Sequence, residues 1–415
     1  MSQTLALTGG SPAVTLAPSP WPITGEQEVQ WMEEVVRSGK WSWMGPHETA
    51  FTEDFCQFLG ANYGMCVSNG TVSIQCALQA VGVEPGDEVI VPGLTWTATM
   101  QAALDIGAQV VLVDIDPETL VLDPEAAAAA ITPRTKALLP VHLYGCMCDM
   151  DALGELAKKH DLKIVEDVAH QHGSQWQGLG AGAIGDAGSF SFQQSKVLTS
   201  GEGGFITCRD EAAYRTAFAL KQVGWGPPPD MAPANKYGHN YRITEMQCVL
   251  LRGGLSRLQA QTEQRDENVQ NLAKGLEALG GPLRAARRDP RVTRQAYYAM
   301  TMVFDKQQSA GLTRAQYLQA LAAEGFHAGE TYEPVYRNPL LNLDDQTSPI
   351  PYRQTVPQDY KTLRLPNCEQ AKNETAVVMS HTQLLGDPEY IAQLLAAVEK
   401  VNGDLAGVKR HFDSQ

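Results

Sequence analysis

Residues 137–169, "ALLPVHLYGCMCDMDALGELAKKHDLKIVEDVA", contain two apolar segments separated by a helical one. Residues 137–145 and 162–169 are nearly continuous apolar runs, whereas the composition of residues 150–160 favours a helix. Parallel strands that are buried on both faces have such runs and are joined by helices. The stretch therefore predicts a strand–helix–strand unit of a parallel sheet, where ligands bind beyond the carboxyl ends of the strands.

The same alternation extends from Gly39 to about residue 222. Further strands are expected at 87–92 and 108–115, and a long helical stretch follows at about 244–279. The predicted fold class is α/β, with a mainly parallel central sheet in a large domain. We expect that domain to span residues 25–280, after an N-terminal arm of residues 1–24 that is rich in proline and glycine.

The remaining residues, 281–415, are predicted to form a smaller C-terminal α+β domain. Residues 295–305 have the pattern of an amphipathic strand. Helices are expected near 313–324, 373–384 and 387–402. The polar, proline-bearing segment 342–360 is expected to be a loop or lid.

Composition narrows the class of protein. The 415 residues are 43% hydrophobic and 19% charged, as in a soluble enzyme, and the net charge of −15 disfavours nucleic acid or an anionic membrane as a partner. No run reaches the roughly 18 apolar residues of a membrane helix, and the amino terminus lacks the pattern of a signal peptide. Eight cysteines without a CxxC pair indicate reduced thiols. We therefore expect a cytoplasmic protein.

Lys196 lies in an unusual context for a lysine. The stretch "GSFSFQQSKVLTSGEGG", residues 188–204, surrounds it with Phe192, Val197 and other apolar residues. Most lysines are solvated surface residues, but partial desolvation makes a lysine amine lose its proton more readily. Lys196 is therefore a candidate nucleophile at a junction of strand and loop.

A second cluster is "VEDVAHQH", in which Asp167 stands where a predicted strand ends. Three interpretations are open. His170, His172 and the acids could bind a metal, or they could hydrogen-bond neighbouring loops. Alternatively, Asp167 could pair with a protonated heterocyclic nitrogen while His170 contacts an adjacent oxygen, and such pairing would lower the pKa of an aspartate.

The sequence "GAGAIG", residues 180–185, matches the glycine pattern of dinucleotide-binding loops. That pattern requires a strand before it and a helix after it. Here a polar loop precedes the glycines and a β-type run follows them, which argues against a nicotinamide site.

Two further motifs follow predicted strands. In "SNGTVSIQCAL", Gly70 and Thr71 open a helix, and a helix amino terminus binds anions such as phosphate, although plain N-capping gives the same pattern. In "VPGLTWTATM", Trp96 follows a strand end, where an aromatic ring could face the same crevice or could pack in a core or interface.

Taken together, these motifs describe one cofactor. A phosphate site, an aromatic ring, an acid for a ring nitrogen and a lysine occur in order at one edge of a parallel sheet. These are the groups that pyridoxal 5′-phosphate requires, because its aldehyde bonds to a lysine amine. No metal is expected under this interpretation.

The chain also resembles the DegT/DnrJ/StrS family of sugar and cyclitol aminotransferases from about residue 20 onward, which implies the fold-type I arrangement of PLP-dependent transferases. The motifs that carry the resemblance are "SGKWSWMGP", "SNGTVSIQCAL", "GDEVIVPGLTWTAT", "VHLYG", "EDVAHQHGS", "GSFSFQQSKVLTSGEGG" and "GHNYRITEMQ". The resemblance implies that Lys196 bonds to the cofactor and moves protons, and that Asp167 pairs with its ring nitrogen. It further implies that Trp96 stacks on the ring and that His170, where many relatives carry glutamine, contacts the phenolic oxygen. The phosphate would be held by Gly70, Thr71, Ser191 and, from the neighbouring subunit, Asn240.

The resemblance also implies an activity. Lys196 is present, whereas relatives that are dehydratases or have lost catalysis replace it, so an aminotransferase is favoured. "FSFQQSK", "AHQHGSQW" and "WSWMG" are most similar to inosose aminotransferases, which implies transfer from L-glutamine or L-glutamate to a cyclic polyhydroxy ketone such as scyllo-inosose. A homodimer with shared active sites is implied as well. Candidate substrate-binding residues are Trp43, Tyr332 and Glu333.

Several alternatives remain open at this point. Within the same family, the acceptor could be a nucleotide-linked ketosugar, or the enzyme could be similar to aminohydroxybenzoate synthases. A metal-dependent hydrolase or lyase would use His170 and His172. A non-enzymatic regulator that binds pyridoxal phosphate is another possibility, although no basic DNA-binding segment supports it.

Overall fold

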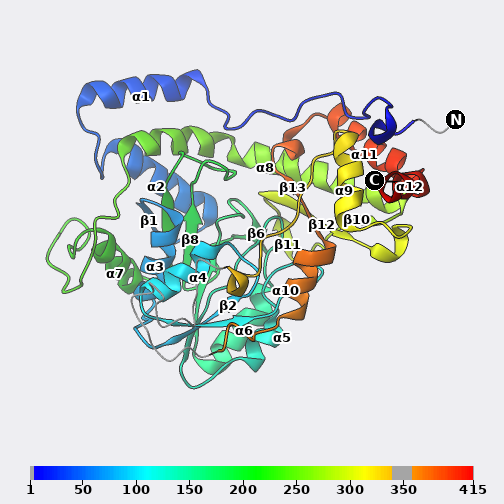
Figure 1. Ribbon diagram of the computed structural model, residues 1–415. Helices are drawn as coiled ribbons and strands as arrows, with labels where there is room; N and C mark the ends of the chain where they lie inside the picture. Colours follow the sequence, from blue (N-terminus) through cyan, green and yellow to red (C-terminus); the bar gives the residue numbers. More distant parts are fainter. Residues whose placement is uncertain (1–3, 339–357, 415) are drawn as a thin grey trace.

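The computed structural model describes residues 4–338 and 358–414, and a seven-stranded sheet lies at the centre of the larger part (Figure 1). In spatial order the strands are β1 (Tyr63–Val67), β9 (Gly204–Cys208), β8 (Ala187–Ser191), β5 (Lys163–Asp167), β4 (Thr135–Leu138), β2 (Glu88–Pro92) and β3 (Gln109–Val113). The pairs from β8 to β3 are parallel, whereas β9 runs antiparallel to both β1 and β8. The prediction of an α/β fold with a mainly parallel sheet is confirmed.

Strand β4 is shorter than the predicted strand at 137–145. Pro140 has no amide hydrogen to donate, and its carbonyl accepts a bond from the Asp167 amide at 2.9 Å instead. Beyond Leu138 the chain continues beside the end of β5 through an isolated parallel bridge between Val141 and Asp167, and Val141 and Leu143 line a cavity there.

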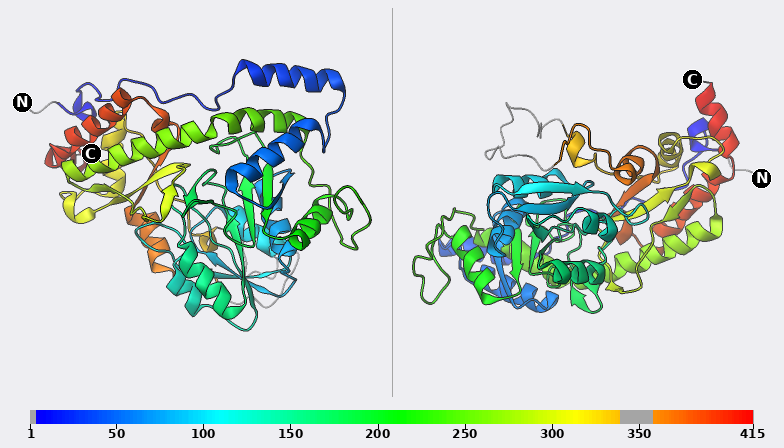
Figure 2. Two further views of the ribbon diagram at one scale, coloured as in Figure 1. Left: turned by 180° about the vertical axis from the view of Figure 1, so that it is seen from behind. Right: turned by 90° about the horizontal axis from the view of Figure 1, so that it is seen from below.

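Helices cover both faces of the central sheet (Figures 1 and 2). They are α2 (Pro46–Leu59), α3 (Gly70–Ala80), α4 (Thr97–Asp105), α5 (Pro124–Ala129), α6 (Met150–His160) and α7 (Glu211–Lys221). Neighbouring residues of β8 face opposite sides: Ser189 hydrogen-bonds Ser73 of α3, whereas Phe190 packs on Phe55 of α2 with ring centres 5.2 Å apart. This burial on both faces explains the continuous apolar runs in the sequence.

A second, antiparallel sheet forms the centre of the smaller part. Its strands are β10 (Leu283–Ala285), β12 (Ala299–Phe304) and β13 (Ala376–Ser380). The accompanying helices are α9 (Arg314–Ala323), α10 (Pro366–Gln370), α11 (Pro388–Asn402) and α12 (Leu405–Asp413). A short third sheet consists of β11 (Val292–Arg294), β6 (Gln175–Trp176) and β7 (Leu179–Gly180). It pairs a strand from the carboxyl-terminal part of the chain with two strands that follow β5.

Two expectations for the smaller part are corrected. The helix expected near 373–384 is wrong beyond Thr375, because a short π-helix at Ala371–Thr375 leads into β13, which pairs with β12 along its whole length. The β-branched residues of "AVV", at the start of β13, favour a strand. The backbone of this strand finds its hydrogen-bond partners on β12. Strand β12 is buried at every residue instead of being amphipathic, because helices and strands cover it on both sides.

The hydrophobic residues form two clusters, one around each sheet. Helix α1 (Glu26–Ser38) and the long helix α8 (Glu245–Leu279) run side by side along the top of the molecule (Figure 1). The carboxyl half of α8 joins the smaller cluster, and so do Leu5 and Val14 of the N-terminal arm. Because α8 and the arm cross the predicted boundaries in this way, the clusters do not define domain limits. The limits 1–24, 25–280 and 281–415 remain sequence predictions. Most of the expected loop or lid at 342–360 lies outside the described residues.

Among the described residues, none of the helices combines the length and apolarity needed to span a membrane.

Candidate active site

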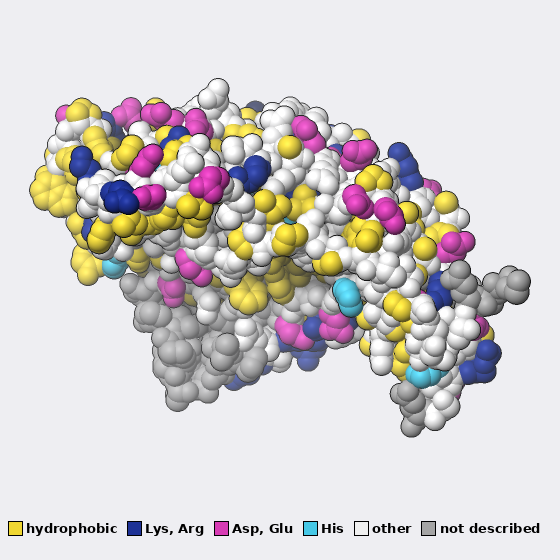
Figure 3. Space-filling model, turned by 90° about the horizontal axis from the view of Figure 1, so that it is seen from above, with side chains coloured by type: hydrophobic (Ala, Val, Ile, Leu, Met, Phe, Trp, Pro, Cys, Tyr) yellow, Lys and Arg dark blue, Asp and Glu magenta, His cyan; other side chains and the backbone are white. Residues whose placement is uncertain are grey.

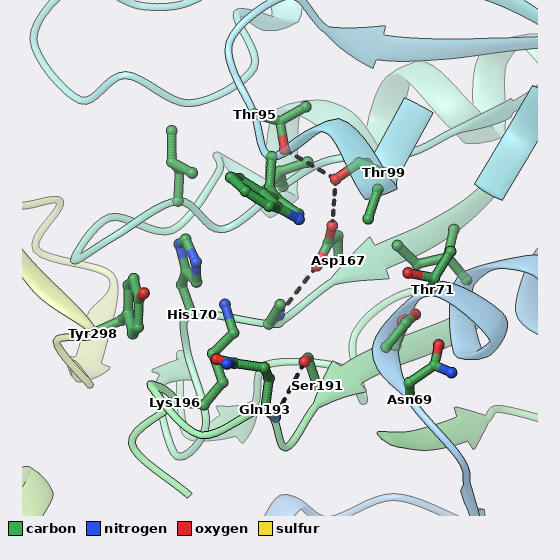
Figure 4. Close-up of a pocket in the computed structure, with 18 of the residues that line it drawn as sticks. Asn69, Thr71, Thr95, Thr99, Asp167, His170, Ser191, Gln193, Lys196 and Tyr298 are labelled. Carbon is green, nitrogen blue, oxygen red and sulfur yellow. Dashed lines mark hydrogen bonds between the residues drawn. The ribbon is translucent and has the colours of Figure 1, made fainter. Parts of the chain in front are cut away.

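A cavity of about 790 Å³ lies at the carboxyl ends of the parallel strands (Figure 4). It is bordered by the ends of β5 and β8 and by the amino termini of α3 and α4. Tyr298 and Tyr332, from the carboxyl-terminal part of the chain, border it as well. Eight of the residues predicted from the sequence line it: Gly70, Thr71, Trp96, Asp167, His170, Ser191, Lys196 and Tyr332. The tertiary structure therefore brings together motifs that are separated by as much as 262 positions in the chain, from Gly70 to Tyr332.

Lys196 projects into the middle of this cavity (Figure 4). It follows β8 by a short loop, and its backbone amide donates to the Gln193 carbonyl at 2.9 Å. Its Nζ lies 4.6 Å from the centre of the Tyr298 ring. Burial lowers the pKa of the amine to about 8, although the nearby Asp167 carboxylate raises it. A sizeable fraction of the amine is therefore neutral and nucleophilic near neutral pH.

Asp167 ends β5 and is almost fully buried. Its Oδ2 accepts a hydrogen bond from Thr99 Oγ1 at 2.8 Å, and its Oδ1 accepts one from the Ala169 amide at 3.1 Å. Burial raises the pKa of the carboxyl, an effect that these two bonds and the Lys196 charge oppose. A buried carboxylate of this kind is stabilised by a cationic partner within the cavity.

His170 presents a defined tautomer to the cavity. The Tyr144 amide donates to His170 Nδ1 at 3.1 Å, so in the neutral ring Nε2 carries the proton and is a donor. Burial and the Lys196 charge hold the pKa of His170 well below its usual range, so the ring is neutral. The ring also stacks on Tyr298, with centres 4.0 Å apart and planes 15° apart.

Asn69, Thr71 and Ser191 lie at the opposite end of the cavity from Tyr298 (Figure 4). The Asn69 side chain caps α3 by accepting from the Val72 amide at 3.0 Å, and this leaves the first amides of the helix without intrahelical acceptors. Gly70 permits close contact with β8: a Cβ at this position would lie 2.6 Å from the Cβ of Ser191. Helix amides and hydroxyls in this arrangement form an anion site.

The glycine motif at 180–185 serves a structural purpose. The amides of Gly182, Ile184 and Gly185 donate to the carboxylate of Glu166, at 2.9, 2.9 and 2.6 Å. The loop therefore binds a carboxylate of the chain itself, and no dinucleotide interpretation is needed.

The metal interpretation of His170 and His172 finds no support in the described part of the chain. His172 Nε2 donates to the Ser191 carbonyl at 2.8 Å, whereas His170 Nδ1 accepts from a backbone amide. No group of three or more histidine, cysteine, aspartate or glutamate side chains is placed to hold a metal ion among the residues described.

Three predicted site residues lie away from this cavity. Glu333 is largely exposed and pairs with Lys372 at 3.2 Å. Asn240 is exposed on the segment after α7 and pairs as an isolated bridge with Gln222. Trp43 lies near this segment, with the Arg242 guanidinium 5.7 Å from its ring centre.

Three residues that shape the site were not among the predicted ones. Tyr298 stacks on His170 and faces Lys196, and its place in residues 295–305 predicts only a strand. Thr99 follows Trp96 by three residues, so helical spacing at the start of α4 could have indicated that both face the cavity. Tyr144, whose φ of 53° is in the left-handed region, donates its amide to His170 and accepts from the Tyr332 amide at 3.2 Å.

The residues present match the chemical groups of pyridoxal 5′-phosphate. The α3 amino terminus and Ser191 suit its phosphate, Asp167 suits its protonated ring nitrogen, and His170 Nε2 is a donor for its ring oxygen. Lys196, the cavity's amine, is available for its aldehyde. Because Gly70 has no side chain, the amino terminus of α3 can lie close to Ser191 at the end of β8, and the two elements that suit the phosphate meet.

Comparison with known proteins places the chain among aminotransferases. Residues 22–382 match the DegT/DnrJ/EryC1/StrS aminotransferase family. A protein of Streptoalloteichus tenebrarius, provisionally assigned as an L-glutamine:3-amino-2,3-dideoxy-scyllo-inosose aminotransferase, is 41% identical over 99% of this chain and 100% of its own. An L-glutamine:2-deoxy-scyllo-inosose aminotransferase of Streptomyces paromomycinus is 36% identical over 97% and 98%.

A solved structure gives the same result at the level of the fold. The crystal structure of 3-amino-5-hydroxybenzoic acid synthase superposes with a TM-score of 0.82 and 32% identity, covering 96% of this chain and 99% of that one. The family match spans most of the chain, and the two relatives match it nearly end to end. The protein is therefore an aminotransferase that belongs to the DegT/DnrJ/EryC1/StrS family.

Proposed function

We propose that the protein uses pyridoxal 5′-phosphate to move the amino group of L-glutamine, or of L-glutamate, onto a cyclic polyhydroxy ketone of the scyllo-inosose type. The observation that carries the proposal is that Lys196 and Asp167 share one cavity with the amino terminus of α3 and Ser191, which suit an anion. The activities named for the relatives at 41% and 36% identity support the choice of substrates.

When bound, the cofactor supplies an aldehyde that takes up an amino group and a ring that withdraws electrons. The chain holds the group from three sides. The α3 amino terminus and Ser191 bind the phosphate, Asp167 keeps the ring nitrogen protonated, and Trp96 borders the ring position. Thr99 fixes the Asp167 carboxylate through its hydroxyl.

Lys196 performs the proton chemistry in this proposal. Its Nζ, which burial makes easier to deprotonate, would hold the aldehyde group of the cofactor, and the same amine would hold and return a proton near the substrate carbon. The Tyr298 and His170 rings pack at this end of the cavity and exclude water from around Nζ.

The character of the cavity favours a neutral polyol over a nucleotide-linked sugar. Among the described residues that line the cavity, Lys196 is the only lysine or arginine. A diphosphate usually binds to several cationic side chains. Arg337, which is near in sequence to Tyr332, is paired with Glu369 at 2.9 Å. Tyr332 lines the cavity and offers a hydroxyl to a ring of hydroxyl groups; Trp43 and Glu333 would act only from outside the cavity of their own chain.

The proposal includes a homodimer with shared active sites. Apolar side chains on and after α1 are about half exposed, namely Val29, Val36, Trp41 and Met44. Figure 3 shows hydrophobic side chains on the face that carries this helix. Such a patch is typical of a subunit interface. Asn240 and Trp43, both outside the cavity of their own chain, would reach the site of the partner.

Half-reactions test the substrate assignment. The cofactor-loaded enzyme is treated with L-glutamine, the donor is removed, and candidate ketones are added while the visible absorbance of the cofactor is followed. We expect L-glutamine to remove the aldehyde-form band and scyllo-inosose to restore it. Recovery with nucleotide ketosugars and none with inososes would overturn the acceptor, and no response to any amino donor would favour a regulator. The Lys196→Ala variant is the control.

A further inference from the structure

The loop of residues 191–196, which carries Lys196, is held by three aromatic rings from distant parts of the chain. Each ring N–H donates to one backbone carbonyl of the loop: His172 Nε2 to Ser191 at 2.8 Å, Trp21 Nε1 to Gln194 at 3.1 Å, and His381 Nε2 to Ser195 at 3.0 Å. The N-terminal arm, the large sheet and the smaller sheet thus each contribute one donor. We refer to these three side chains as the loop-binding rings.

The two histidines among the loop-binding rings have a defined tautomer. A carbonyl oxygen only accepts, so Nε2 carries the proton in His172 and in His381, and Nδ1 of each neutral ring is an acceptor. Burial lowers the pKa of both rings to about 3. Both Nδ1 atoms are buried and have no hydrogen-bond partner within residues 4–338 and 358–414.

Within the described part of the chain, Arg265 of α8 has buried hydrogen-bond donors without acceptors, whereas the two histidines have buried acceptors without donors. Its side chain is fully buried, and Nε, Nη1 and Nη2 all lack a hydrogen-bond partner among the described residues. No carboxylate of the described chain forms an ion pair with it, which makes it unlike Arg288, whose guanidinium pairs with Asp266. A buried guanidinium with unused donors is costly, so its retention needs an explanation.

Arg265 lies among the loop-binding rings. Its guanidinium carbon is 5.7 Å from the ring centre of Trp21, which in turn packs edge-on against His381 at 4.7 Å. Its charge contributes to the low pKa of both His172 and His381. One turn earlier on α8, the Thr262 hydroxyl lies 3.4 Å from where a Cβ would stand on Gly173, the residue after His172.

We propose that Arg265 is a positioning residue for Lys196: through buried water, its guanidinium hydrogen-bonds Nδ1 of His172 and of His381 and so fixes the rings that hold the lysine loop. The guanidinium offers five donors and the two histidines offer lone pairs, and buried water joins groups of this kind. The inference rests on the proposed role of Lys196, which Arg265 serves without contacting any substrate.

The structural reason for such a device is the position of the loop. Lys196 follows a segment without regular secondary structure, and its three carbonyl contacts come from side chains that lie far apart in the sequence. The Arg265 charge adds to the effect of burial in keeping both histidines neutral, and donors bonded to Nδ1 through water would keep the proton of each ring on Nε2, which faces the carbonyl. Loss of that charge would let the rings rotate and the loop would sample other conformations.

The variant Arg265→Met removes the donors while keeping the length of the side chain, and Arg265→Lys is the conservative variant. Arg288→Met is the matched control, because Arg288 pairs with the residue next to Arg265 and makes no contact with the loop among those described. The first readout is amide hydrogen exchange of residues 191–199 in the cofactor-free protein. The second is kcat and KM for amino transfer.

We expect Arg265→Met to increase exchange in residues 191–199 while the rest of the sheet keeps its protection. The kcat should fall by about ten-fold or more with KM changed much less, because the lysine is misplaced. Arg265→Lys should recover part of both effects, and Arg288→Met should change neither beyond a loss of thermal stability.

Two results would overturn the proposal. One is wild-type loop exchange and kcat in Arg265→Met; the other is a uniform rise in exchange across the molecule, as a merely structural arginine would give. If Arg265→Met does not fold, His381→Phe removes the donor to Ser195 and must loosen the same peptide. Since the exchange measurement needs no turnover, it separates a failure of this inference from a failure of the proposed function.

Discussion

Lys196 and Asp167 are two ionisable groups whose burial favours the uncharged form of each. Burial lowers the pKa of the amine to about 8 and raises the pKa of the carboxyl. The first shift prepares a nucleophile, and the second leaves a carboxylate that gains most from a cationic partner. The same apolar surroundings therefore serve opposite purposes at two positions of one cavity.

The first residue-scale prediction concerns Lys196→Ala. The variant should fold and should lose amino transfer by about a thousand-fold or more, since its loop keeps all three carbonyl contacts while the nucleophile is gone. Borohydride reduction of the loaded wild type, followed by peptide mapping, should place the label within residues 188–204. Lys221 is the internal control, because it is buried in an ion pair with Glu48 at 3.2 Å. A label on Lys221 or Lys236 would contradict the assignment.

The second concerns Asp167→Asn. The folded pKa of Asp167 is above the unfolded value of 3.8, so the ionised carboxylate costs stability once the pH rises through that window. We expect the cofactor-free variant to melt at a higher temperature than wild type at pH 7, with a smaller difference at pH 5. Turnover should fall by about a hundred-fold, because a neutral amide cannot keep the ring nitrogen protonated. Unchanged turnover would mean that Asp167 only caps the loop after β5.

At the scale of elements, the cavity depends on how closely α3 approaches β8. Ser73 of α3 hydrogen-bonds Ser189 of β8, and Gly70 lies against Ser191 without room for a side chain. The helix amino terminus and the strand end therefore lie close enough to bind one anion together, as the proposed function requires. A glycine is required at this helix start by contact alone and not by a left-handed backbone.

The element-scale prediction is that Gly70→Ala separates α3 from β8. The added Cβ would lie 2.6 Å from the Cβ of Ser191, a strain of about 1–3 kcal/mol in a packed site. Affinity for the cofactor should fall by about ten-fold or more, measured by equilibrium titration of the cofactor-free protein. Gly154→Ala is the matched control, since a Cβ there on α6 meets no atom within 4 Å. Equal affinity in the two variants would contradict this account of the site.

The whole molecule joins its two parts through the cavity and through α8. This helix belongs to both hydrophobic clusters, and the N-terminal arm runs from the smaller cluster past the lysine loop to α1 (Figure 1). Helix α1 packs on α8 with one face, while Val29 and Val36 remain exposed on it. The exposed apolar surface and the outlying Asn240 both favour a second subunit.

The whole-molecule prediction tests shared sites by mixing subunits. Lys196→Ala subunits are mixed with Asn240→Asp subunits, whose added charge repels phosphate. If Asn240 acts on the partner's site, one site of each hybrid carries both changes and the other carries neither. An equal mixture should then reach about a quarter of wild-type activity, above either parent. No rise, with subunit exchange verified by mass, would place Asn240 in the site of its own subunit.

The sequence by itself determined the architecture and most of the cavity. Apolar runs that alternate with helices predict parallel strands buried on both faces, because the connecting helices cover those faces. Parallel strands place Gly70, Trp96, Asp167 and Lys196 at one edge whatever their separation in the chain. Local signals failed where pairing with a distant strand decides the conformation, as in β13.

Only the tertiary structure decided which side chains meet across elements. Tyr298, which directly precedes β12, reaches His170 and Lys196 because its backbone amide donates to the Tyr144 carbonyl at 3.2 Å. Arg265 lies near the loop-binding rings because α8 contributes to both hydrophobic clusters. No pattern of neighbouring residues encodes such contacts, since they depend on how separately formed elements pack against each other. Burial has the same origin, and burial shifts the pKa values of Lys196 and Asp167.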